Sequence, residues 1–116
     1  MPTYDDDPDH PILVNPFLWE LMELTYRRAR SDGRQSHLDM VFEQNGETRR
    51  LRFYNPQSIE WFPGGVPNSF GMCILDVSRR QMEGIGVRVA NFEQSYGAPT
   101  FWAERVVDLD DPNNLD

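Results

Sequence analysis

Three aspartates near the N-terminus are the first residues whose spacing suggests chemistry. Asp5, Asp7 and Asp9 match the positions that open a calcium-binding loop. Such a loop needs Gly at its sixth position and a bidentate Glu at its twelfth, but His10 and Pro16 stand there. The sequence therefore favours a solvated acidic arm over a calcium site.

The remaining metal-ligating and nucleophilic residues are few. His10 and His37 are the only histidines and Cys73 is the only cysteine, so the chain has too few nitrogen and sulfur ligands at suitable spacing for a zinc site. Cys73, His37 and Asp76 could supply a nucleophile, a base and an orienting carboxylate. Cys73, however, lies in an apolar run with no neighbouring cation in sequence to lower its thiol pKa. We therefore predict no catalytic, cofactor or metal site.

Established phosphate and hydrolase motifs are also missing. The chain has no G-x-G-x-x-G, no Gly-Lys-Ser/Thr phosphate loop, no H-E-x-x-H and no G-x-S-x-G. All eleven basic residues are arginines, and a strip of them could bind phosphate groups. The net charge of -8 could suggest a nucleic-acid mimic or a partner of a basic protein, but the charge comes from the two ends of the chain, where acidic residues usually favour solubility. Residues 10–107 hold eleven acidic residues against eleven arginines, and this neutral body without a nucleic-acid-reading motif predicts no nucleic-acid partner.

The chain shows no signal-peptide pattern and no apolar run of the roughly 18 residues that span a bilayer. Its single cysteine cannot form an internal disulfide. We therefore expect a cytoplasmic protein without a membrane partner.

Two groups of side chains are candidates for contact with a partner. The first is a polar loop that core packing does not explain, with Arg79, Arg80, Gln81 and Glu83. The second is an aromatic group, with Trp61, Phe62 and Trp102. Tryptophan, tyrosine and arginine dominate binding hot spots. A solvated turn for the first group, and packing beneath the nearby Pro-Gly loop for the second, remain the alternatives.

These side chains need elements to position them, and the first is a predicted helix. Asn15 before Pro16 is a helix start, because Asn caps free N–H groups and Pro has a preset φ. Apolar positions then recur at helical spacing, at Leu18, Leu21, Met22, Thr25 and Ala29. The pattern predicts a helix over about 16–31, which ends before Gly33.

A hairpin follows the predicted helix. Asn45-Gly46 is a strong signal for a two-residue turn. Pairing Gln44 with Glu47 places Asp39 opposite Arg52 and gathers the apolar side chains on one face, namely Leu38, Met40, Phe42, Leu51 and Phe53. The turn and the hydrophobic pattern give the same register, so we predict strands over about 37–44 and 47–54.

Further strands are expected over about 59–62, 69–78, 85–93 and 100–109. The stretch from Phe70 to Val77 is apolar on both faces, which predicts a central strand covered on both sides. In its neighbour, Val87 and Val89 form one face and Arg88 the other.

The expected fold class is α+β, in a single domain over residues 1–116. One N-terminal helix packs on an antiparallel, meander-like curled sheet of about five or six strands, and flexible acidic tails cover 1–11 and 110–116. One helix covers only part of one sheet face. A strongly curled sheet, or a homodimer, would have to cover the rest.

The run from Ile74 to Gly84, followed by Val87, Val89 and the strand from Phe101 to Val107, resembles small bacterial domains of unassigned function. Some of these domains look like immunity proteins of polymorphic toxin systems. The resemblance covers about residues 37–109. It implies a non-enzymatic binding protein and transfers no catalytic residue to this chain.

Two functions from different classes are therefore open. The first is a non-catalytic accessory domain that binds another protein or itself, with an immunity-like inhibitor as one form. The second is an enzyme or small-ligand-binding protein with a pocket between helix and sheet, which would use Cys73, His37 or the arginines.

Overall fold

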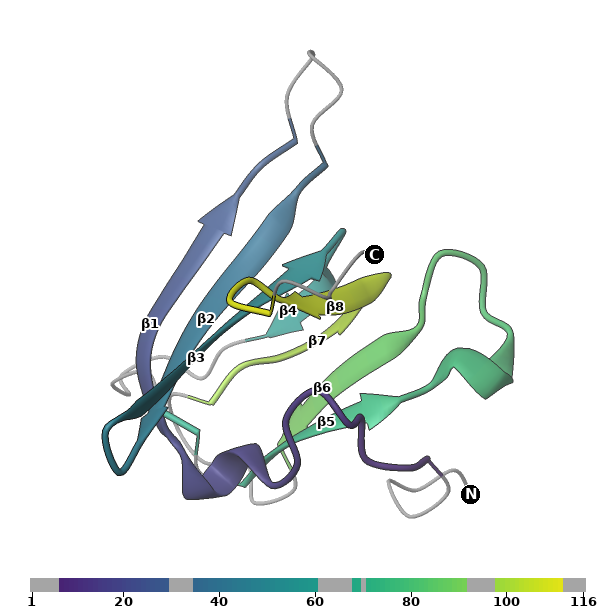
Figure 1. Ribbon diagram of the computed structural model, residues 1–116. Helices are drawn as coiled ribbons and strands as arrows, with labels where there is room; N and C mark the ends of the chain where they lie inside the picture. Colours follow the sequence, from purple (N-terminus) through teal and green to yellow (C-terminus); the bar gives the residue numbers. More distant parts are fainter. Residues whose placement is uncertain (1–6, 30–34, 61–67, 70, 92–97, 112–116) are drawn as a thin grey trace.

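The computed structural model describes residues 7–29, 35–60, 68–69, 71–91 and 98–111. They form two four-stranded antiparallel sheets that face each other (Figure 1). The strands of the first sheet are, in spatial order, β1 (Glu20–Arg27), β2 (His37–Gln44), β3 (Glu47–Tyr54) and β8 (Arg105–Asp108). Those of the second sheet are β4 (Gln57–Glu60), β7 (Thr100–Ala103), β6 (Val87–Asn91) and β5 (Met72–Asp76). Two short 3-10 turns, η2 (Pro16–Leu18) and η3 (Ser78–Arg80), accompany them.

Two segments of the chain run directly from one sheet into the other. Only Asn55 and Pro56 separate β3 from β4, and only Glu104 separates β7 from β8. Because β3 pairs with β8 and β4 pairs with β7, the paired strands bend together at these residues. The chain thereby folds its second sheet back over its first, and the inner faces cover each other without a second copy.

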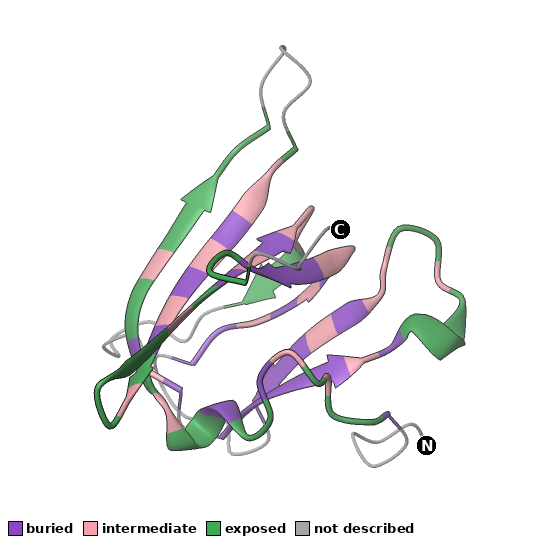
Figure 2. Cartoon of the chain, viewed as in Figure 1, coloured by how far each residue is buried: buried purple, intermediate pink, exposed green. Residues whose placement is uncertain are grey.

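The core lies between the two sheets, and both supply alternate side chains to it. Phe53 of β3 and Phe101 of β7 meet edge to face, with ring centroids 5.1 Å apart. The buried members are Leu13, Leu21, Leu38, Met40, Phe42, Leu51, Phe53, Met72, Ile74, Val87, Val89, Phe101, Ala103 and Val106. Figure 2 shows the alternation of buried and more exposed residues along β2. Burial of this apolar surface is the main stabilising term of the fold.

The predicted helix over residues 16–31 is wrong, and the α+β fold class is wrong with it. The single curled sheet of about five or six strands is also wrong, because the described strands form two four-stranded sheets. The helical turn ends after three residues, at Leu18, and β1 begins at Glu20. A bulge leaves Met22 without a partner on β2, so that Leu21 and Leu24 both point toward the core. In a regular strand, residues three apart lie on opposite faces. The bulge therefore produces the three-residue spacing that suggested a helical face.

The predicted hairpin is confirmed in bounds and in register. The strands are His37–Gln44 and Glu47–Tyr54, and Gln44 pairs with Glu47. Asn45 and Gly46 both have positive φ, 50° and 83°, as a two-residue turn of this kind requires. Asp39 lies opposite Arg52, as predicted.

The later strands overlap their predicted positions, with two changes. The strand predicted over 100–109 is wrong as a single element, because it divides at Glu104 into β7 of the second sheet and β8 of the first. β5 is an edge strand of the second sheet, where we predicted a central one. The prediction that both faces of this strand are covered is confirmed, since Met72–Leu75 are all buried. Met72 and Ile74 face the core between the sheets, and Cys73 and Leu75 belong to a second buried cluster with Val77 and Ala90.

The N-terminal segment explains how an edge strand is so well covered. Asp9 forms a bridge with Leu75, the His10 N–H donates to the carbonyl of Ile74, and the Asp76 N–H donates to the carbonyl of Pro8. These residues belong to the tail that we expected to be flexible over 1–11, yet they lie along the free edge of β5 (Figure 1).

Several predicted features fall outside the described residues. Trp61, Phe62 and Phe70 are among them, as are residues 1–6 and 112–116 of the two expected tails. Within the described ranges, no helix has the length and apolar character needed to cross a membrane.

Candidate functional site

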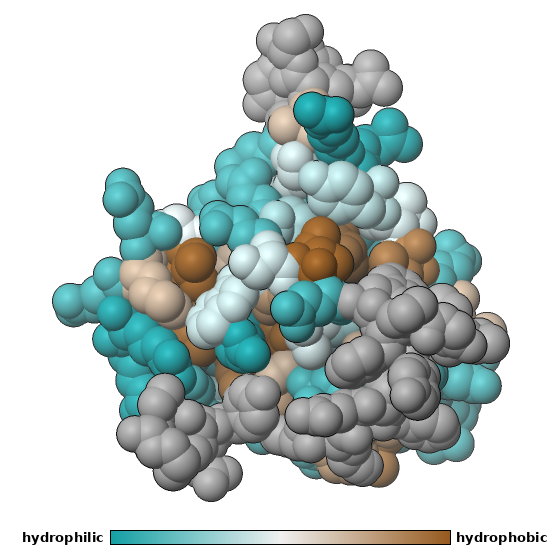
Figure 3. All heavy atoms as spheres, turned by 180° about the vertical axis from the view of Figure 1, so that it is seen from behind, coloured by the Kyte–Doolittle hydropathy of each residue, from teal (hydrophilic) through white to brown (hydrophobic). Residues whose placement is uncertain are grey.

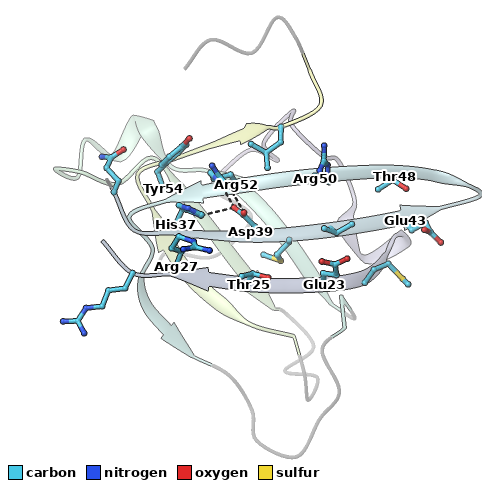
Figure 4. Close-up of a pocket in the computed structure, with 16 residues that line it drawn as sticks. Glu23, Thr25, Arg27, His37, Asp39, Glu43, Thr48, Arg50, Arg52 and Tyr54 are labelled. Carbon is cyan, nitrogen blue, oxygen red and sulfur yellow. Dashed lines mark hydrogen bonds and ion pairs between the residues drawn. The ribbon is translucent and has the colours of Figure 1, made fainter. Parts of the chain in front are cut away.

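A hollow formed by the described residues lies on the outer face of the first sheet, which faces away from the core. Its volume is about 1060 Å³. Strand alternation places its side chains, because every second residue of β1, β2 and β3 points away from the core. Residues that line it are Met22, Glu23, Thr25, Arg27, Arg28, Gln35, His37, Asp39, Met40, Val41, Glu43, Thr48, Arg50, Arg52, Tyr54 and Leu109 (Figure 4). We call this surface the outer face.

Strand pairing arranges the outer face in rows that cross the sheet. The first row holds Arg27, His37, Tyr54 and Arg105. The second holds Thr25, Asp39, Arg52 and Val107. The third holds Glu23, Val41 and Arg50, and the Leu109 N–H donates to the carbonyl of Arg50 beside it. The face thus changes from aromatic and cationic at one end to mixed and partly apolar at the other.

An ion-pair network centred on Asp39 fixes the middle of the face. Arg52 Nε donates to Asp39 Oδ1 at 2.8 Å, and a terminal Arg52 nitrogen donates to Oδ2 at 2.9 Å. His37 Nδ1 lies 3.2 Å from the same Oδ1 (Figure 4). Two parallel hydrogen bonds from a guanidinium to a carboxylate are directional as well as strong. Asp39 therefore holds two side chains in place: Arg52, its partner on β3, and His37, which lies two residues earlier on β2.

The charge states of this network follow from its geometry. Burial acts to raise the pKa of Asp39, but the hydrogen bonds and charge of Arg52, with a smaller part from His37, lower it overall. The Asp39 carboxylate in turn raises the pKa of Arg52. At neutral pH the pair is an ionised, mutually satisfied unit, so Asp39 is not a free base.

Two further contacts restrain side chains at the edges of the outer face. The guanidinium of Arg105 stacks over the Tyr54 ring, 4.1 Å from its centroid. Arg50 Nε donates to both carboxylate oxygens of Asp110, at 3.2 and 3.1 Å. Both side chains of that second pair are largely exposed, and Asp110 belongs to the tail expected over 110–116.

The nucleophilic set of Cys73, His37 and Asp76 is not assembled. Cys73 lies in the second sheet, on the side away from the core, whereas His37 lies on the outer face of the first sheet. Burial also raises the pKa of the Cys73 thiol to about 11. Asp76 instead accepts hydrogen bonds from the backbone N–H and the hydroxyl of Ser78. In the described part of the chain, no group of three or more metal-ligating side chains comes together.

The arginines of the polar loop make contacts within the chain, and a contact of this loop with a partner stays a prediction. Arg80 donates to the Asp7 carboxylate from Nε at 3.1 Å and from a terminal nitrogen, and Arg79 Nε lies 3.9 Å from it. The Asp7 side chain is only 2% exposed. This pair fastens the N-terminal segment to the turn after β5. Gln81, in a left-handed conformation, and Glu83 are exposed.

Trp102 packs against the second buried cluster and carries the Arg88 guanidinium 4.2 Å above its ring. It is half-buried on the second sheet and is not part of the outer face. Seen from behind, the described surface shows apolar side chains in separate small areas among hydrophilic ones (Figure 3).

Sequence reasoning predicted the pairing of Asp39 with Arg52 but did not identify the outer face as a site. The signal was available in the confirmed hairpin register, which already placed charged side chains together on one face. The pocket between helix and sheet cannot form among the described residues, because the helix is absent. Comparisons with protein-family models, with curated proteins and with solved structures found no match.

Proposed function

We propose that this chain is a non-catalytic binding protein that contacts another protein through its outer face. The observation that carries the proposal is the hollow of about 1060 Å³ over that face. Its side chains come from three neighbouring strands of one rigid sheet, so the surface exists before a partner arrives. Preformed surfaces lose less conformational freedom on binding.

The chemistry of the outer face has the layout of a protein contact. Three apolar side chains line it, and we call them the apolar band: Met22, which is 50% exposed, half-buried Val41, and Leu109, which is 40% exposed. Glu23 and Arg50 are the cross-strand partners of Val41. Charged side chains flank this band, and Tyr54 with its stacked arginine stands at one end. An apolar centre with a polar rim, enriched in tyrosine and arginine, is typical of specific interfaces.

The His37–Asp39 pair supports binding rather than catalysis. Both oxygens of Asp39 accept hydrogen bonds from Arg52, so the carboxylate serves to position its neighbours. Immunity-like inhibition of a toxin is the form of protein binding that the sequence resemblance implies. A cytoplasmic location belongs to the same proposal, and fractionation of cells that express the tagged chain tests it.

A matched pair of variants tests the outer face as the contact. Val41→Arg places a long cation at the centre of the apolar band. Ile59→Arg makes the same replacement on β4 of the second sheet, where Ile59 is 40% exposed. The immobilised wild-type chain and both variants are used to capture proteins from a lysate of the source cells. The captured protein is then purified and titrated against each chain by calorimetry.

We expect Val41→Arg to weaken binding about 30-fold or more, since disrupting a central contact costs about 2 kcal/mol. Ile59→Arg should bind within about twofold of the wild type, since changes outside an interface have little effect on affinity. Equal binding by the wild type and Val41→Arg would place the contact elsewhere and refute the proposal. Capture of no protein that distinguishes the two variants would also count against it.

A further inference from the structure

β1 is the outer edge strand of the first sheet, and among the described residues it pairs only with β2 (Figure 1). Beyond the bulge at Met22, the segment Glu23–Arg27 pairs with β2 without a break. An edge strand leaves alternate backbone N–H and C=O groups unpaired, which makes it a template for another strand. This segment contains no proline, so its backbone can accept a partner strand along its full length.

The two faces of this segment carry different side chains. Glu23, Thr25 and Arg27 point to the outer face, beside Val41, Asp39 and His37 of β2. Leu24 and Tyr26 point to the core side. Tyr26 is nevertheless 49% exposed, and Leu24 is only partly buried. The strand thus ends the sheet with an incompletely covered apolar face.

We propose that two copies of this chain associate through β1, as antiparallel strands with a two-fold axis at Thr25. In that register, Thr25 lies opposite Thr25 of the second copy. Glu23 lies opposite Arg27 of the second copy, twice over by symmetry. Leu24 lies opposite Tyr26 of the second copy, also twice. Directly opposite residues of antiparallel strands share a face, and all these pairs satisfy that rule.

Charge complementarity selects this register over its neighbours. An axis at Leu24 places Glu23 opposite Thr25, and an axis at Tyr26 places Arg27 opposite Thr25, so neither register pairs opposite charges. An axis at Glu23 brings two glutamates together, which is unfavourable. In the described part of the chain, Glu23 and Arg27 are exposed and make no ion pair with another side chain. Both are therefore available to the second copy.

The association would join two first sheets into one continuous eight-stranded sheet with both outer faces on the same side. The contact is isologous, as a two-fold dimer requires, and therefore closes without forming a filament. Pairing would cover the exposed core-side surface of Leu24 and Tyr26. The inference stands on β1 alone and does not depend on the function proposed for the outer face.

Charge-swap variants of the full chain test it by analytical ultracentrifugation. Glu23→Arg places arginine opposite Arg27, and Arg27→Glu places glutamate opposite Glu23, so each variant alone should dimerise about tenfold more weakly or worse. Mixed in equal amounts, the two variants regain both opposite-charge pairs and should form a heterodimer. Glu47→Arg, an equal charge change at the exposed hairpin turn, should dimerise like the wild type.

A cross-linking measurement decides the question if the charge variants fail to fold. Thr25→Cys should be joined rapidly into a dimer by a short thiol cross-linker, because the two copies meet at this residue. Thr48→Cys, exposed on β3 of the same sheet, should react far more slowly. A wild-type chain that stays monomeric at several hundred micromolar, single charge variants that dimerise like the wild type, or equal cross-linking at Thr25 and Thr48 would each overturn the proposal.

Discussion

Replacement of Asp39 by Asn tests whether the ion-pair network holds the outer face. The substitution keeps the shape of the side chain and removes its charge. An amide oxygen can still accept one hydrogen bond from Arg52, but the second bond and the attraction to Arg52 and His37 are lost. We therefore expect Asp39→Asn to fold and to be less stable than the wild type.

The magnitude follows from the exposure of the pair. The Asp39 side chain is 24% exposed and that of Arg52 is 30% exposed. Exposed ion pairs contribute about 0.2–1 kcal/mol, and hydrogen bonds to charged groups about 1.5–3 kcal/mol. This half-buried pair lies between these cases, and one bond survives the substitution. The free energy of unfolding should fall by about 1–2 kcal/mol, which lowers Tm by about 4–8 °C.

The pH dependence of the loss identifies its cause. The folded state lowers the pKa of Asp39 below 3.8, so its contribution is fully present above the unfolded-state pKa. The contribution disappears as the pH falls through the lower, folded-state pKa. The stability difference between the wild type and Asp39→Asn should therefore be constant from about pH 5 upward and shrink below about pH 4.

Urea unfolding followed by circular dichroism, at a series of pH values, measures this difference. Asp110→Asn is the matched control, because Asp110 pairs with Arg50 on the same sheet but both side chains are largely exposed. We expect no measurable change in the control at neutral pH. The reasoning is refuted if Asp39→Asn is as stable as the wild type at pH 7, or if its deficit persists undiminished at low pH.

Three further predictions follow from other parts of the structure. Cys73 should react with a disulfide reagent at pH 8 only as fast as the chain unfolds, because burial raises its thiol pKa to about 11; labelling at the rate of a free thiol would contradict this. Arg80→Gln should lower the free energy of unfolding in urea by about 2–3 kcal/mol, since among the described residues it leaves the buried Asp7 carboxylate with the more distant Arg79 alone. Arg79→Gln should lower it clearly less, and equal losses would refute the assignment. Gly86→Ala should lower the free energy of unfolding by about 1–3 kcal/mol, because a Cβ there would lie 2.8 Å from the backbone oxygen of Glu104. If the variant unfolds at the wild-type Tm, the backbone at Glu104 can move away without cost and the prediction is wrong.

The part of the fold that sequence predicted best is the hairpin of β2 and β3. Two independent local signals agreed there, the Asn45-Gly46 turn and strict alternation of apolar side chains. A register error of one residue would move every side chain to the wrong face, so the two signals can agree only in the correct register. The same register placed Asp39 opposite Arg52 and thus contained the centre of the candidate site.

The helix prediction was wrong because the sequence of β1 satisfies a helical pattern for another reason. The bulge at Met22 changes the phase of the strand, so Leu21 and Leu24 share a face. Glu20–Arg27 is also rich in residues that favour helices, such as glutamate, leucine and methionine. Pairing with β2 and burial against the second sheet outweighed those preferences, and neither interaction is visible in a short window of sequence.

A second change of phase occurs at Glu104. We placed the segment 100–109 in one strand, but Glu104 breaks it. Strict alternation from Phe101 would bring Val107 to the core between the sheets, and after the break Val106 lies there. The central position predicted for β5 was wrong for a related reason. Its second face packs with Val77, Ala90 and Trp102 on the side away from the core. The N-terminal residues 8–10 bond along its free edge, which the acidic composition of that segment did not suggest.

Hydrogen exchange of the full chain, free and bound to the protein captured on it, tests the outer face most directly. The structure predicts slower exchange on binding in β2 and β3, over residues 37–54, because their outer side chains form the hollow. Exchange in β5 and β6 of the second sheet, within 72–91, should not change. Protection confined to residues 72–91, with none over 37–54, would contradict the assignment of the contact surface.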